Sequence, residues 1–108
     1  MPLYYRTESW EDIEHSHYDP DASLRTLDGL IQAVEGYILR VKDEGAVGLK
    51  MHAAPYQEPD REQALQAFRD LRDGTRKQLP ANNPLRDYIV YRAVEFGSEQ
   101  DLVICVHT

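Results

Sequence analysis

The feature that most constrains the fold is an unbroken apolar run near the carboxyl end of the chain, Leu102–Val106. A strand without polar alternation is typical of a parallel sheet that is covered on both faces. Only His107 and Thr108 follow this run, so the sequence provides no later helix to cover it. We therefore expect the run to be enclosed by neighbours that this sequence does not itself encode.

Two more segments are predicted to be strands, at residues 3–7 and residues 46–51, because both are short and rich in strand-forming or apolar side chains. An acidic segment at residues 8–21 is predicted to be a loop. The next segment has the three- and four-residue spacing of an amphipathic helix, which Ser23 would cap and Gly45 would end. Its apolar stripe consists of Leu24, Leu27, Leu30, Ile31, Val34, Tyr37, Ile38 and Val41.

Two further helices are predicted before the final strand. Asp60, after Pro59, is a typical helix start, and Gln63 stands where a capping-box partner would. Asn83, followed by a proline, opens the next helix, and Gly97 is placed to end it. The order strand, helix, strand, helix pair, strand is typical of βαβ units. The sequence therefore predicts an α/β fold with about three parallel strands and covering helices.

We expect a single partial domain over residues 1–108. Residues 1–22 would form a strand and the acidic loop, residues 23–58 a helix, a strand and a loop, and residues 59–108 the helix pair and terminal strand. Three parallel strands make neither a closed barrel nor a complete doubly wound sheet, because the edge strands stay unpaired. This organisation predicts a segment of a larger α/β fold.

The charge balance argues against two classes of partner. The chain has 12 basic and 19 acidic side chains, a formal charge of −7 and a pI near 4.9. Phosphate backbones and anionic lipid surfaces attract clustered Lys and Arg, so we expect neither nucleic acid nor membrane as a partner. No apolar run approaches the roughly 20 residues of a membrane span, and no signal peptide pattern opens the chain, which predicts a cytoplasmic protein. The one cysteine, Cys105, is expected to be a core side chain.

Three residues at predicted strand ends could carry chemistry. His107 directly follows the terminal run, and catalytic groups collect at the carboxyl ends of parallel strands in α/β barrels. Neutral imidazole is also a common metal ligand. Lys50 and His52, at the end of the middle strand, would face the same way, and Lys50 could polarise a carbonyl group. The plainer alternatives are a hydrogen-bonded histidine at a strand end and a lysine whose stem lies along the surface.

Other patterns are more simply structural. His15 and His17 form an HxH pair, which on a strand would point both imidazoles to one face, but they lie in a polar segment and favour a solvated loop. Arg6 and Glu8, at the end of the first predicted strand, could lie at the same end of the sheet as His107, or they could form an exposed ion pair. The charged run at residues 60–76 is typical of the solvated face of a helix. The sequence contains no glycine-rich phosphate loop and no nucleophile elbow.

Residues 45–56 (GAVGLKMHAAPY) and residues 83–108 (NPLRDYIVYRAVEFGSEQDLVICVHT) together resemble the amidohydrolase-related family of metal-dependent hydrolases and decarboxylases. In that family a helix leads into a strand that ends in His-Thr-Gly. The resemblance implies a (β/α)₈ TIM barrel, of which this chain would be a partial segment carrying about strands three to five. It further implies that His107 binds a divalent metal, Zn²⁺ or Mn²⁺. From their place at the end of the middle strand, His52 is a second candidate metal ligand and Lys50 a candidate catalytic residue.

In the intact enzyme, the resemblance implies, a metal-bound water would attack a carbonyl-type group of a small-molecule substrate. The family also uses an HxH pair on its first strand, a histidine on its sixth and an aspartate on its eighth, and none of those strands occurs in this sequence. Because a hydrolytic zinc site needs about three protein ligands, we expect the isolated chain to be inactive.

Two alternatives stay open. One is a non-catalytic α/β module that forms a homo-oligomer through its exposed sheet edges or docks on a partner chain. The other is a small binding domain that uses Lys50, His52 and His107 for an acidic ligand.

Overall fold

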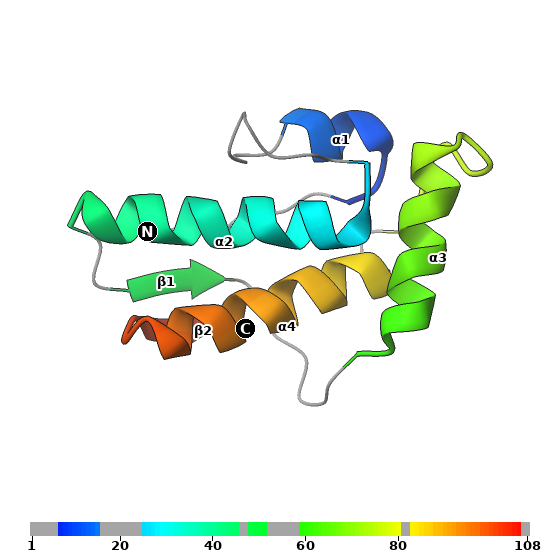
Figure 1. The fold of residues 1–108 in the computed structure, drawn as a ribbon. Helices are drawn as coiled ribbons and strands as arrows, with labels where there is room; N and C mark the ends of the chain where they lie inside the picture. The colour runs from blue at the N-terminus through cyan, green and yellow to red at the C-terminus, as the bar shows by residue number, and fades with distance from the viewer. Residues whose placement is uncertain (1–6, 16–24, 46–47, 52–58, 81–82, 107–108) are drawn as a thin grey trace.

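The computed structural model describes residues 7–15, 25–45, 48–51, 59–80 and 83–106. Within these ranges the chain forms four helices and two short strands (Figure 1). Their bounds are α1 Trp10–His15, α2 Leu27–Asp43, β1 Gly48–Met51, α3 Arg61–Arg72, α4 Pro84–Glu99 and β2 Val103–Val106. The described structure is therefore mainly helical.

The predicted fold class, an α/β segment of a TIM-barrel-like sheet with about three parallel strands, is wrong. The described residues contain one sheet of two strands, each four residues long. The main packing is between helices, because α4 lies against both α2 and α3. A sheet this small offers too little surface to bury the apolar stripes of three long helices, so the stripes pack on one another.

Helix α2 follows its predicted stripe, but its cap lies three residues after the expected one. The Thr26 side chain accepts a hydrogen bond from the Gly29 backbone N–H at 3.0 Å and so caps the helix, whereas Ser23 lies outside the described residues. Gly45 has a φ of 103°, which confirms the expected left-handed residue after the helix end. The predicted positions that are buried are Leu27, Leu30, Ile31, Val34, Ile38 and Val41; Tyr37 is half-buried and Leu24 is not described.

Helices α3 and α4 begin at the residues that the sequence predicts. The Asp60 carboxylate accepts a hydrogen bond from the Glu62 backbone N–H at 2.8 Å. The Asn83 side chain accepts one from the Arg86 backbone N–H at 2.9 Å, and a proline occupies the first turn of α4. Both caps satisfy backbone donors that have no partner inside the helix.

The predicted end of α4 at Gly97 is wrong. The helix continues to Glu99, and Gly97 lies buried inside it. The turn closes when the Leu102 backbone N–H donates to the Gly97 carbonyl at 3.0 Å, and Asp101 takes the left-handed conformation with a φ of 62°. An aspartate tolerates this conformation better than most residues, so a glycine was not required at the helix end.

The expected acidic loop contains helix α1. Its Ile13 side chain is fully buried, and the Trp10 ring meets the Phe68 ring edge-on at 5.6 Å between centroids. Trp10 and Ile13 are three residues apart, so one face of a single helical turn carries both to the core. The first predicted strand is not found at Thr7, which is described outside any strand; residues 3–6 are not described.

Strands β1 and β2 pair in parallel, with Gly48 opposite Val103 and Met51 opposite Val106. A Cβ atom at Gly48 would lie 2.8 Å from the Val103 carbonyl oxygen, so the close approach of the two strands requires glycine there. Complete burial of the terminal run is not found, because Val103 is 62% exposed, although Leu102 is buried.

Candidate functional site

The carboxyl edge of the two-stranded sheet is where the sequence predicts a metal site. Met51 and Val106 are register partners at the ends of β1 and β2. The sequence continues from them with His52 and His107, which both lie outside the described residues. Lys50 is placed by its backbone in β1, opposite Cys105, and the side chains of both residues are outside the described part of the structure.

Only one residue of the other histidine pair lies within the described part of the structure. His15 is the last residue of α1, and His17 is outside the described ranges. Arg6 is also undescribed, while the Glu8 carbonyl accepts a hydrogen bond from the Leu79 backbone N–H at 2.7 Å. Over the described residues, no group of three or more His, Cys, Asp or Glu side chains is arranged to hold a metal ion.

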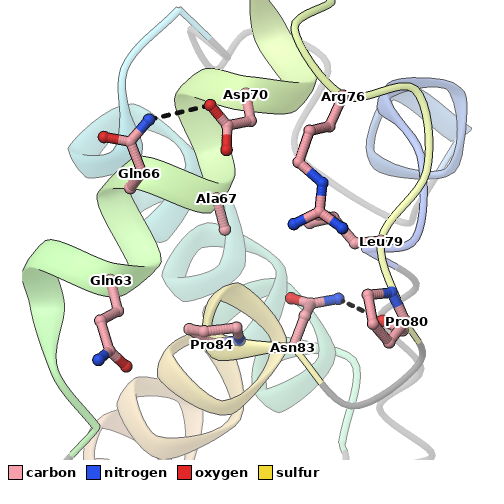
Figure 2. Close-up of a pocket in the computed structure, with 9 residues that line it drawn as sticks. All are labelled: Gln63, Gln66, Ala67, Asp70, Arg76, Leu79, Pro80, Asn83 and Pro84. Carbon is pink, nitrogen blue, oxygen red and sulfur yellow. Dashed lines mark hydrogen bonds between the residues drawn. The ribbon is translucent and has the colours of Figure 1, made fainter.

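A cleft of about 310 Å³ lies between α3, the start of α4 and the segment that joins them (Figure 2). The sequence does not predict this cleft, because the charged run at residues 60–76 is typical of a solvated helix face. Side chains from both helices and from the joining segment line it: Gln63, Gln66, Ala67, Asp70, Arg76, Leu79, Pro80, Asn83 and Pro84. The sequence signal for it is the combination of polar residues on α3 with Pro80 in the connection and Pro84 at the start of α4.

Asn83 forms the buried base of this cleft. It is 2% exposed, and its Nδ2 donates to the Pro80 carbonyl and to the Thr7 hydroxyl, each at 2.9 Å. Thr7 is 1% exposed, so the pair is removed from water. Because Asn83 also caps α4, one side chain joins the start of the helix, the joining segment and the N-terminal segment.

Two backbone hydrogen bonds fix the segment between α3 and α4. The Arg76 N–H donates to the Asp70 carbonyl at 3.0 Å, and the Leu79 N–H donates to the Glu8 carbonyl at 2.7 Å. Gly74, with a φ of 77°, makes the turn that follows α3 and precedes both hydrogen-bonded residues. The wall that carries Arg76 is therefore anchored at both ends.

The rim of the cleft carries opposite charges above an apolar floor. The Gln66 side-chain amide donates to one Asp70 carboxylate oxygen at 2.9 Å, and the Arg76 guanidinium points into the same gap (Figure 2). Among the described residues, neither Asp70 nor Arg76 takes part in an ion pair. The nine lining residues combine two amide side chains, one carboxylate and one guanidinium with apolar groups, an arrangement that can bind a small polar ligand.

No protein-family model matches this chain, and comparison with curated proteins and with solved structures likewise gives no match. The resemblance to amidohydrolases therefore stays a prediction from the sequence. None of the helices in the described ranges is both long enough and apolar enough to span a membrane.

Proposed function

We propose that this chain supplies part of a divalent-metal site of a hydrolase, with His52 and His107 as ligands. The observation that supports this most is the register of the sheet, in which Met51 and Val106 are opposite one another at the ends of two parallel strands. Neighbouring strands lie about 4.8 Å apart, and the next residue along a chain is about 3.8 Å away. In each strand that next residue is a histidine.

Two histidines that follow paired strand residues in the sequence are a ligand set of the kind that binds a metal through imidazole. Zn²⁺ accepts imidazole nitrogens in tetrahedral sites, and a hydrolytic site has about three protein ligands and one open position. The two histidines are therefore an incomplete set, which further ligands from outside the described residues would have to complete. Lys50, one residue before the end of β1, is the candidate group for polarising a substrate carbonyl.

The reaction class comes from the resemblance of residues 45–56 and 83–108 to metal-dependent hydrolases and decarboxylases. A bound divalent cation supplies Lewis-acid polarisation and activates water near neutral pH. The chain's own contribution would be to hold the cation through two histidines that follow the ends of neighbouring strands in the sequence.

Isothermal titration of the full chain with Zn²⁺, and separately with Mn²⁺, tests this proposal. We expect about one equivalent of Zn²⁺ to bind, and His52→Ala and His107→Ala each to weaken binding at least tenfold. The matched control is His15→Ala combined with His17→Ala, which should leave the affinity unchanged. No binding, or binding that depends on His15 and His17 and persists in His107→Ala, would refute the assignment.

A second candidate function is supported by a separate observation, the exposure of a side chain on strand β2. Parallel strands are normally covered on both faces, yet Val103 of β2 is 62% exposed. On this candidate the chain is a non-catalytic helical module that pairs with a second copy through its strands. Sedimentation velocity over a range of concentrations should then show a dimer that Val103→Lys weakens; a monomer at every concentration rules this candidate out.

A further inference from the structure

We infer that the cleft between α3 and α4 binds a small zwitterion, specifically a free amino acid with an aliphatic side chain. This site is separate from the proposed metal site, since its residues come from α3, the start of α4 and their connection (Figure 2). The inference is drawn from the charges, the floor and the anchoring of the cleft.

The charges come from opposite walls. Asp70 lies on α3 and Arg76 on the joining segment, and both side chains face the same gap (Figure 2). The hydrogen bond between the Arg76 N–H and the Asp70 carbonyl, at 3.0 Å, holds the two residues at one end of the cleft. A guanidinium binds a carboxylate through two parallel N–H groups, and a carboxylate accepts hydrogen bonds from an ammonium. An α-amino acid carries both complementary groups on one carbon atom.

The Gln66 side chain supports the role of Asp70. Its amide donates to the Asp70 Oδ1 atom at 2.9 Å, which fixes the orientation of the carboxylate and leaves the other oxygen for a ligand. Asp70 is itself half-buried, so a ligand ammonium there would be partly shielded from water. Partial removal from water strengthens a charge-assisted hydrogen bond.

The floor of the cleft favours an aliphatic side chain. Ala67 and Leu79 are buried, and two prolines, Pro80 and Pro84, complete the apolar surface beside Asn83. The volume of about 310 Å³ is at the lower end of the ~300–1,000 Å³ of small-molecule sites. This volume has room for a ligand of the size of leucine.

The walls are fixed before any ligand arrives. Asn83 ties the start of α4 to Pro80 and Thr7, and the Leu79 N–H is bonded to the Glu8 carbonyl at 2.7 Å. When a site is already in its binding geometry, ligand binding carries a smaller free-energy cost for ordering side chains and loops. The arrangement is therefore suited to a ligand that makes few contacts.

The experiment is an NMR titration of the full ¹⁵N-labelled chain with L-leucine. We expect chemical-shift changes confined to the backbone amides of α3 around Asp70 and of the segment from Arg76 to Leu79. Arg76→Gln and Asp70→Asn should each weaken binding about tenfold. The matched controls are Arg69→Gln and Glu62→Gln, which lie on the same helix but do not line the cleft.

Two leucine analogues separate the two charges. 4-Methylpentanoate lacks the ammonium group and should bind equally well to the parent chain and to Asp70→Asn, whereas leucinamide lacks the carboxylate and should not distinguish Arg76→Gln from the parent chain. Absence of shifts in the cleft, or equal effects of Arg76→Gln and Arg69→Gln, would overturn the inference. Because His52→Ala with His107→Ala should still bind leucine, failure of the metal proposal would not affect this result.

Discussion

Asn83 shows how one residue can combine a local and a distant role. Its capping of α4 is a local property, and the sequence predicts it from an asparagine followed by a proline. Its hydrogen bonds to Thr7 join positions 76 residues apart, and nothing in the sequence pattern indicates that pairing. The same holds at the other end of the cleft, where Asp70 and Arg76 were predictable only as charged positions.

Replacing Asn83 should therefore cost more than the loss of an ordinary helix cap. We expect Asn83→Ala to lower the free energy of unfolding by about 2–4 kcal/mol, because it removes the cap and leaves the buried Thr7 hydroxyl unpaired. Thr26→Ala, which removes the exposed cap of α2, should cost about 1 kcal/mol. Urea denaturation of the two variants measures the difference, and equal losses would show that the buried pair contributes nothing.

Asp73, at the end of α3, gives a prediction about pH. The side-chain hydrogen bond from Arg72 lowers the pKa of this carboxyl below its ordinary value. A lowered pKa in the folded state means that the charged pair stabilises the fold above about pH 4 and that this contribution disappears as the pH falls through the lowered pKa. The pair is exposed, so the effect is small and weakens in salt.

Asp73→Asn should remove this pH dependence. Its unfolding midpoint in urea should lie slightly below that of the parent chain at pH 6.5, and the two midpoints should converge as the pH is lowered toward 2.5. A difference that is the same at both values, or that grows in acid, would contradict the role of the Arg72–Asp73 pair.

At the scale of elements, the long amphipathic helix is what a sequence predicts best. Six predicted positions of the α2 stripe are buried, and the pattern is readable because apolar residues repeat at helical spacing over several turns. Helix α1 is not predicted, because it is too short for an apolar pattern to repeat. It has six residues, two of them acidic in the first turn, and only Trp10 and Ile13 indicate an apolar face.

Ile13 is therefore the residue that tests whether α1 belongs to the core. Ile13→Ala should destabilise the chain by about 2–5 kcal/mol, since the side chain is fully buried in the same cluster as Phe68. Glu14→Ala, on the exposed side of α1, should change stability by less than about 0.5 kcal/mol. Thermal or urea unfolding measures both, and a neutral Ile13→Ala would support the solvated loop that the sequence predicts.

At the scale of the whole molecule, the order of elements was largely predictable but their packing was not. The sequence predicts three helices and two of the strands near their observed positions, yet it cannot say whether apolar stripes will face a sheet or one another. The outcome depends on the size of the sheet. Because the two strands have only four residues each, the helices pack on one another, and α2, α3 and α4 supply most of the core. Consequently the predicted barrel-like sheet is not found, while the parallel register at the end of β1 and β2 remains as the basis for the metal proposal.

X-ray absorption at the zinc edge tests that proposal most directly, because it reports the atoms bound to the metal. For the full chain with one equivalent of Zn²⁺, we expect the scattering pattern of two imidazoles at about 2.0–2.1 Å. His107→Ala should reduce the pattern to one imidazole, and His15→Ala with His17→Ala should leave it intact. A spectrum without imidazole ligands, or one that His107→Ala does not change, would contradict the assignment of His52 and His107 as a shared metal site.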